Sequence, residues 1–232
     1  MSDHRVAEHP DAAELARAVA DDVAAILSVA IERRGESLMF APGGSTPRTS
    51  FALLAEAGLD WSRVTILPGD ERVAPPQSGL SNFAEIRGAF AAGGAKLQPL
   101  TEEAADCQRA AQQAEDLLQS LPWPPDLVWL GLGEDGHIAS IFPGDCGVGA
   151  SDTDRRAACV VPDPLPPGAP VARVTLTMPA ILSARAIVLA GTGQAKKALL
   201  EGRDPAAHGP ALPVHQLLER ATQPVFVHWS PT

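Results

Sequence analysis

One histidine of this sequence stands in a context that suits catalysis. His137 closes the glycine-rich segment Gly131-Leu132-Gly133-Glu134-Asp135-Gly136-His137, directly after the apolar run 126–130. An imidazole has an ordinary pKa of about 6.5, so His137 could act as a general base near neutral pH. Asp135 could hold the ring in one tautomer or help to place a water molecule. An isolated histidine is more often structural, but this position, after a buried strand and beside an acid and glycines, favours catalysis.

A second segment, Pro42-Gly43-Gly44-Ser45-Thr46-Pro47, has the layout of an anion cradle. Gly43 and Gly44 would let backbone N–H groups approach a ligand, and Ser45 and Thr46 add hydroxyl groups. We expect a helix to follow, with Thr46 as its cap, and its first N–H groups would attract a phosphate. Taken alone, this diglycine loop fits an ordinary strand-to-helix turn better. It is neither a P-loop nor a dinucleotide-binding turn.

Cationic side chains occur at three further places where an anion could be bound. In Gly69-Asp70-Glu71-Arg72, the guanidinium of Arg72 could bind a phosphate with two nitrogens, and Asp70 or Glu71 could orient it or bond to sugar hydroxyls. Arg173 begins an apolar strand. Lys196 stands in the first turn of an expected helix, where a cation opposes the helix dipole unless an anion is bound nearby. Each of these groups could instead be a solvated charge.

The elements that must position these residues alternate along the chain. Hydrophobic periodicity and cap residues predict helices over 11–34, from 47 onward, over 81–90, 101–120 and 194–201, and strands over 37–41, 63–67, 126–130, 157–161, 173–177, 186–190 and 224–229. This alternation predicts an α/β fold, in one domain over residues 1–232, with a mostly parallel sheet covered on both faces. Ligands bind at the carboxyl ends of such strands, where three polar, glycine-rich loops follow three strands directly.

Composition and charge narrow the class of protein. The 232 residues carry a formal net charge of −10, which argues against a binder of nucleic acid or of an anionic membrane. A small anionic substrate would need a local concentration of cations and N–H groups. No apolar run approaches the roughly 20 residues of a membrane-spanning helix. The N-terminus has no apolar core of signal-peptide length, which favours a cytoplasmic protein.

The chain contains three cysteines: Cys107, Cys146 and Cys159. An odd number without paired spacing predicts free thiols in a reducing compartment. No pair has the spacing of zinc ligands, so we expect no metal site.

Several of these segments, taken in order, resemble the glucosamine-6-phosphate isomerase/6-phosphogluconolactonase family. The motifs that carry the resemblance are Gly43-Gly44-Ser45-Thr46-Pro47, Gly69-Asp70-Glu71-Arg72, Ser81-Asn82, Gly131-x-Gly-x-Asp-Gly-His137, Phe142-Pro143-Gly144, Arg173-x-Thr-Leu-Thr and Thr192-Gly193-x-x-Lys196. They extend from about residue 10 to residue 228, and the ordered set is far more specific than any single motif. The resemblance implies a modified Rossmann-like three-layer sandwich.

The resemblance also implies an activity and roles for the matching residues. The activity is the hydrolysis of 6-phospho-D-glucono-1,5-lactone to 6-phospho-D-gluconate in the pentose phosphate pathway, without a metal or an organic cofactor. His137 would activate water, with Asp135 beside it. The substrate would be bound by Gly43, Gly44, Ser45, Thr46, Asp70, Arg72, Gly136, Arg173 and Lys196.

Two other functions fit parts of the same pattern. Deaminases and isomerases of amino-sugar phosphates share the Gly-Ser-Thr-Pro and Asp-Gly-His signatures. After the second strand, however, they typically have Asp-Glu-Tyr, where this chain has Arg72 in the third place. After the histidine they typically have Ala-Phe-Asn-Glu-Pro, where this chain has the segment 139–143. The chain therefore lacks the glutamate expected for ring opening. A non-catalytic sensor of sugar phosphates is the second alternative. A serine hydrolase is disfavoured because no Gly-x-Ser-x-Gly elbow surrounds Ser140. The sequence does not indicate an oligomeric state.

Overall fold

The computed structural model describes residues 6–44, 46–144, 154–166, 168–201 and 212–232. Its centre is a seven-stranded sheet with the strand order β1-β10-β9-β6-β2-β3-β5, in which all neighbouring strands are parallel. The strands are β1 (Val6–Glu8), β2 (Ser37–Ala41), β3 (Val64–Pro68), β5 (Lys96–Leu97), β6 (Leu127–Gly131), β9 (Ile187–Thr192) and β10 (Val225–Ser230). The predicted α/β class and mostly parallel sheet are confirmed.

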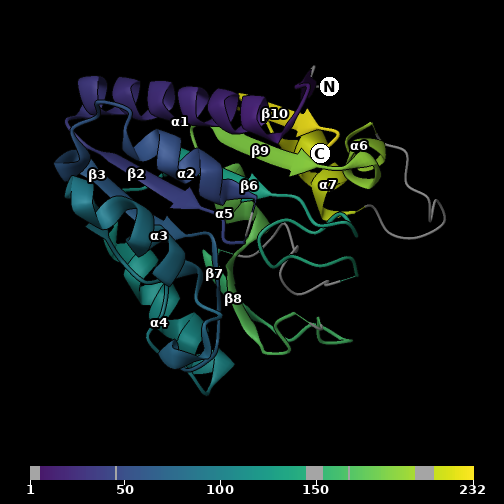
Figure 1. Ribbon diagram of the computed structural model, residues 1–232. Helices are drawn as coiled ribbons and strands as arrows, with labels where there is room; N and C mark the ends of the chain where they lie inside the picture. The colour runs from purple at the N-terminus through teal and green to yellow at the C-terminus, as the bar shows by residue number, and fades with distance from the viewer. Residues whose placement is uncertain (1–5, 45, 145–153, 167, 202–211) are drawn as a thin grey trace.

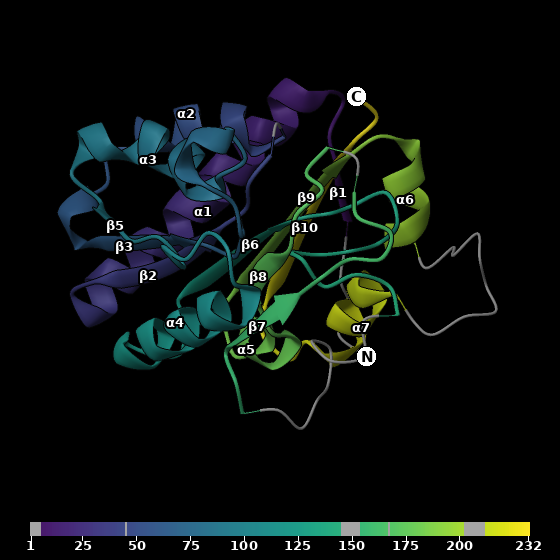
Figure 2. The same ribbon diagram turned by 90° about the horizontal axis from the view of Figure 1, so that it is seen from below.

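Helices cover both faces of this sheet, as Figures 1 and 2 show. One face carries α1 (Ala12–Arg34), α2 (Pro47–Ala55) and α3 (Asn82–Phe90), and the other carries α4 (Cys107–Ser120), α5 (Met178–Leu182) and α7 (Pro213–Arg220). Helix α6 (Gln194–Leu200) follows β9 directly. Short 3₁₀ turns lie at Trp61–Arg63, Pro76–Ser78 and Ala91–Gly93. The result is the three-layer arrangement expected from the sequence.

Strand β2 shows why the sheet is buried on both sides. All five of its residues are buried, and they alternate between two separate cores. Leu38 and Phe40 pack on the side of α4 and α7, whereas Met39 and Ala41 pack against α1 and α2. A run of consecutive apolar residues is therefore required here, and this run is what identified the strand in the sequence.

A second, smaller sheet lies beside the main one and was not foreseen as a separate sheet. It consists of β4 (Asp70–Arg72), β8 (Arg173–Leu176) and β7 (Ala157–Val160), which pair in antiparallel order. The sequence placed residues 70–72 in a loop, because three charged residues show no strand periodicity. Their strand geometry comes from pairing with β8, about a hundred residues later in the chain.

Both ends of α1 are capped. Asp11 accepts hydrogen bonds from the N–H groups of Ala13 and Glu14 at the start of α1, and Gly35 ends that helix with φ 82°. The prediction that the Thr46 side chain caps α2 is wrong. Thr46 has helical dihedral angles, and its side chain makes no capping hydrogen bond.

Helix α4 begins at Cys107, later than the predicted residue 101. Asp106 caps it by accepting from the N–H groups of Gln108 and Arg109, and such a cap fixes the first turn. The residues before Asp106 read as helical only because they are polar and rich in alanine.

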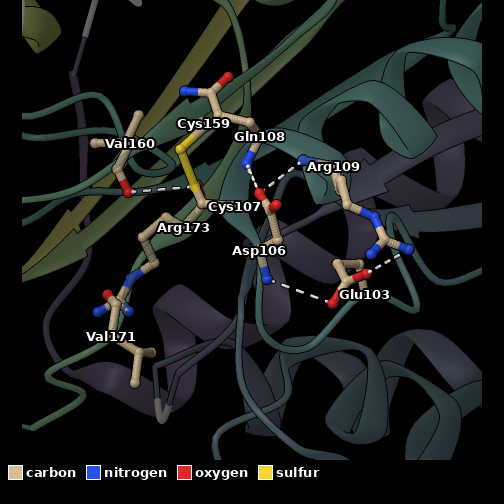
Figure 3. Close-up of a disulfide and its surroundings, with 9 residues drawn as sticks. All are labelled: Glu103, Asp106, Cys107, Gln108, Arg109, Cys159, Val160, Val171 and Arg173. Carbon is tan, nitrogen blue, oxygen red and sulfur yellow. Dashed lines mark hydrogen bonds and ion pairs between the residues drawn. A yellow bond between two sulfur atoms is a disulfide. The ribbon is translucent and has the colours of Figure 1, made fainter.

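The prediction of three free thiols is wrong for two of the cysteines. Cys107, the first residue of α4, and Cys159 of β7 form a disulfide that ties the helix to the small sheet. Figure 3 shows it beside the backbone of Arg173, whose side chain runs away toward Val171. The two cysteines are 52 residues apart, so no local spacing could reveal the pair. Cys146 lies outside the described residues.

Within the described part of the chain, no helix is long and apolar enough to span a membrane.

Candidate active site

A cavity of about 630 Å³ opens at the carboxyl ends of β2, β6 and β9 and beside the small sheet. It brings together most of the predicted site residues from segments far apart in the chain. Those that line it are Gly43, Gly44, Thr46, Asp70, Arg72, His137, Arg173 and Lys196. Ser45 lies outside the described residues.

The imidazole of His137 is held by the carboxylate of Asp135. Oδ1 of Asp135 lies 2.6 Å from ring Nδ1 and 3.1 Å from the backbone nitrogen of His137. A carboxylate only accepts hydrogen bonds, so in the neutral form of the imidazole Nδ1 carries the proton and Nε2 keeps its lone pair. Burial opposes ionisation of Asp135 and is the largest single influence on it, but the hydrogen bond and charge of His137 lower the pKa of Asp135 overall. Asp135 itself does not line the cavity.

An aromatic ring and a glycine turn adjoin His137. The ring of Phe142 lies 4.8 Å from it, centroid to centroid, and Phe142 also lines the cavity. Gly136, predicted to bind substrate, does not line the cavity. It has φ 82°, and its carbonyl accepts from the N–H of Val214, so it shapes the turn before His137.

Arg72 enters the cavity from β4 with part of its hydrogen-bonding capacity committed. Its Nη1 donates to the carbonyl of Leu80 at 3.0 Å and to Oδ1 of Asn82. Its buried Nε has no hydrogen-bond partner among the described residues.

Arg173 reaches the same cavity from β8 and is almost completely buried. Its guanidinium donates to the carbonyls of Val171, at 2.6 Å, and Ala169, at 2.7 Å. Burial lowers the pKa of Arg173, and the nearby charge of Arg72 lowers it further, although Asp70 opposes both effects. Two guanidinium groups thus repel each other beside the cavity, and a bound anion would relieve that repulsion.

Lys196 supplies a third cation from the first turn of α6. Burial lowers the pKa of Lys196, and Glu134 offsets part of that effect. Its neighbour Lys197 points elsewhere, since its Nζ lies 2.8 Å from Glu8 and over the ring of Trp229. Of the two lysines, the motif Thr192-Gly193-x-x-Lys196 singled out Lys196.

The diglycine loop needs its glycines for packing as well as for ligand approach. A β-carbon at Gly43 would lie 1.7 Å from Oδ1 of Asn82, and Gly44 has φ 95°. The N–H of Gly44 donates to Oε2 of Glu85 at 3.2 Å, so it is not free for an anion. The N–H groups of this loop are therefore less available than the sequence suggested.

Asp70 lines the cavity, but both of its carboxylate oxygens already have partners. Nδ2 of Asn82 donates to Oδ1 at 3.1 Å, and the hydroxyl of Ser140 donates to Oδ2 at 2.5 Å. Sequence reasoning gave no role to Asn82 or Ser140, although Asn82 belongs to a segment quoted for the family resemblance. Their function depends on contacts between distant segments, which a single sequence does not display.

This arrangement combines a base with three cations. The base is an imidazole oriented by a carboxylate, and the cations are Arg72, Arg173 and Lys196. They concentrate positive charge locally in a chain of net charge −10. Among the described residues, no group of three or more His, Cys, Asp or Glu side chains is placed to hold a metal ion. The cavity suits a small anionic substrate that is attacked by an activated water.

Comparisons with known proteins agree with this reading. The model of the family described as glucosamine-6-phosphate isomerases/6-phosphogluconolactonase matches residues 10–226. A 6-phosphogluconolactonase from Rhizobium meliloti (strain 1021) is 36% identical over 97% of both chains. One from Pseudomonas aeruginosa is 35% identical, over 95% of this chain and 92% of its own.

Solved structures show the same fold. A 6-phosphogluconolactonase from Shewanella baltica OS155 superimposes with a TM-score of 0.86 at 29% identity, covering 99% of this chain and 98% of its own. A 6-phosphogluconolactonase from Trypanosoma brucei has a TM-score of 0.82 at 26% identity, covering 97% of this chain and 96% of its own. A monomeric glucosamine-6-phosphate deaminase has a TM-score of 0.75 at 20% identity, over 97% of both chains, which shows the shared fold alone.

Proposed function

The chain belongs to the glucosamine-6-phosphate isomerase/6-phosphogluconolactonase family, and from that membership we propose that it hydrolyses 6-phospho-D-glucono-1,5-lactone to 6-phospho-D-gluconate, with His137 activating the water. The observation that carries the proposal is the hydrogen bond of 2.6 Å between Asp135 and Nδ1 of His137 at a cavity lined by three cations. It leaves Nε2 as the basic atom of a residue that lines a space suited to a phosphorylated sugar.

The first chemical step forms a bond between water and the lactone carbonyl carbon. Nε2 of His137 takes a proton from the water as its oxygen attacks, and the carbonyl oxygen becomes an oxyanion. Asp135 stabilises the imidazolium that results, because its carboxylate stays ionised beside the ring. General-base assistance of this kind is worth about 10²–10⁴-fold in rate.

The second step breaks the bond between the carbonyl carbon and the ring oxygen. The ring oxygen leaves as a hydroxyl and takes back the proton held by His137, which restores the neutral imidazole. The product is an open-chain acid that ionises to the carboxylate. Arg72, Arg173 and Lys196 surround the phosphate and the carbonyl, and the binding of the phosphate holds the carbonyl near Nε2.

The proposed setting is the cytoplasm, where phosphorylated sugars are retained because their charge hinders passage through a bilayer. The disulfide removes the cysteine argument for that location, since disulfides are uncommon in reducing compartments. The ligand is a small phosphorylated lactone, and we expect the protein to bind neither nucleic acid nor a membrane.

The test is a pH-stat or coupled assay with freshly made lactone, corrected for spontaneous opening. The wild-type protein should accelerate opening, and His137→Ala should lower turnover by about 10²–10⁴-fold with little change in affinity for 6-phosphogluconate. Near-normal turnover in that variant would refute the proposed role of His137 as the base. Release of ammonia from glucosamine 6-phosphate would favour a deaminase instead, and binding without lactone opening would favour a sensor.

A further inference from the structure

A chain of hydrogen bonds connects the turn at residues 138–141 to the Arg72 side chain. This turn directly follows His137, and we call it the His137 turn. Ser140 donates to Oδ2 of Asp70, and Asn82 donates to Oδ1 of Asp70 and also to its backbone carbonyl at 2.8 Å. Oδ1 of Asn82 in turn accepts from Arg72. We refer to these four residues as the Asp70 bridge.

The Ser140 end of the bridge is directed inward by an unusual backbone conformation. Ile138 and Ile141 close a tight turn with a hydrogen bond of 2.9 Å. Within that turn, Ala139 has φ 49°, the one positive φ of a non-glycine residue in the part of the chain that the structure describes. Such a conformation persists only where the surroundings hold it, and outliers of this kind gather at functional sites. Ser140 is held by its hydroxyl on Asp70 and by its N–H, which donates to Thr175 at 3.1 Å.

The Asn82 end of the bridge supports two other parts of the site. Asn82 is 1% exposed, and its amide fills the space beside Gly43 that a β-carbon would need. The same amide holds Arg72. One buried side chain therefore sets the position of the diglycine loop relative to a cavity cation.

We propose that Ser140, acting through Asp70, is a positioning residue. It keeps the His137 turn and Arg72 in fixed positions relative to each other at the cavity. This inference rests on the proposed function. Ser140 is only 2% exposed and its hydroxyl is committed to the carboxylate of Asp70, so we assign it no role as a nucleophile. Its role is geometric, because a displacement of about 1 Å between a base and its substrate can cost about 10²-fold in rate.

The main test compares Ser140→Ala with Asp70→Asn. The alanine variant breaks the bridge, and kcat per folded molecule should fall by about 10–100-fold. The affinity for 6-phosphogluconate should change less than about threefold, since Arg72 keeps Asn82 and Leu80 as partners and Arg173 keeps Ala169. In Asp70→Asn, the amide can still accept from Asn82 and can donate to the Ser140 hydroxyl, so kcat should recover to within about tenfold of wild type.

Ser37→Ala is the matched control, because Ser37 is equally buried at the start of β2 and its hydroxyl has no partner among the described residues. It should leave kcat unchanged. The ring C–H resonance of His137, identified by its loss in His137→Ala, gives a readout that does not depend on activity. It should shift or broaden in Ser140→Ala and stay in place in Ser37→Ala.

A wild-type kcat and an unmoved His137 resonance in Ser140→Ala would overturn the proposal. It would also be overturned if Asp70→Asn were as impaired as Ser140→Ala, since the charge of Asp70 and not the bridge would then matter. Failure of the wild-type protein to open the lactone would instead refute the proposed function, and the resonance would then decide the bridge by itself.

Discussion

The imidazole of His137 occupies the space that a side chain at Gly133 would need. A β-carbon at residue 133 would lie 2.2 Å from Nδ1 of His137 and 2.7 Å from Oδ1 of Asp135. The backbones are also joined, because the N–H of Gly133 donates to the carbonyl of His137 at 2.9 Å. Glycine is therefore required here for the close approach of the ring.

Gly133→Ala should lower kcat by about 10²-fold while leaving the affinity for 6-phosphogluconate within a few-fold of wild type. The methyl group must push the imidazole away from Asp135. This displaces Nε2 and weakens the hydrogen bond that fixes the tautomer of the ring. The measurement is kcat from the lactone assay together with the Kd of 6-phosphogluconate by calorimetry.

Gly69→Ala is the matched control, since a β-carbon there would meet only the carbonyl of Ala41, at 3.9 Å. It lies close to the site and should retain most of the wild-type kcat. Equal activity of the two variants would show that the ring does not depend on the space at Gly133.

The sequence predicted most of the main sheet because burial on both faces forces consecutive apolar residues. Residues 37–41 form a strand with the predicted bounds, and α1 (Ala12–Arg34) starts one residue after the predicted start and ends at the predicted residue. The small sheet was not predictable as such. Its strand β4 is made of charged residues and exists through pairing with β8, a relationship with no local signal.

The site was predictable where chemistry follows a strand directly, and less so where it depends on contacts at long range. His137 and Asp135 are near neighbours in sequence, so their hydrogen bond could be anticipated. Asp70 was expected to face the substrate, but its oxygens are committed to Asn82 and Ser140. The disulfide is a similar case, because its cysteines meet only when α4 packs on β7.

The lowered pKa of Lys196 predicts a pH limit on anion binding. A lysine with a lowered pKa loses its positive charge at a lower pH than an ordinary lysine, which deprotonates near pH 10.4, so the affinity for 6-phosphogluconate should weaken on the alkaline side below that pH. In Lys196→Arg the cation persists, and the weakening should move to higher pH. Calorimetric titration of 6-phosphogluconate at a series of pH values measures both curves.

Lys197→Arg is the control for that series, because Lys197 is paired with Glu8 and not directed into the cavity. Its curve should overlay that of the wild type. If Lys196→Arg also overlaid the wild type, deprotonation of Lys196 would not govern the alkaline limb.

The disulfide should make stability depend on reducing agents. Cys107 and Cys159 are 52 residues apart, and closing a loop of that length restricts the unfolded chain enough to stabilise the fold by up to about 4 kcal/mol. Urea unfolding of the wild type should therefore shift to lower denaturant when a reductant is added. The double variant Cys107→Ser/Cys159→Ser should unfold early in either condition, and Cys146→Ser should behave like the wild type. Superimposable wild-type curves with and without reductant would refute this contribution.

A buried histidine that does not line the cavity should make the fold less stable in mild acid. His228, in β10, is 4% exposed; its Nε2 lies 3.1 Å from Asp22 of α1, and its Nδ1 lies 3.0 Å from Nε2 of His9. Burial lowers the pKa of His228; Asp22 opposes that effect, and His9 adds to it.

The sign of the effect follows from which state binds the proton. In the unfolded chain His228 titrates at about pH 6.5, whereas the folded protein keeps it neutral to lower pH. As the pH falls below about 6.5, His228 binds a proton in the unfolded state but not in the folded state. The free energy of unfolding therefore drops by at most about 1.4 kcal/mol per pH unit. His228→Gln cannot take up that proton, so its stability should decline less between about pH 7.5 and 5.5. Urea unfolding at both pH values compares the two declines, in which the titrating groups that do not contact His228 cancel. Parallel declines would mean that His228 titrates alike in both states, and that Asp22 fully compensates its burial.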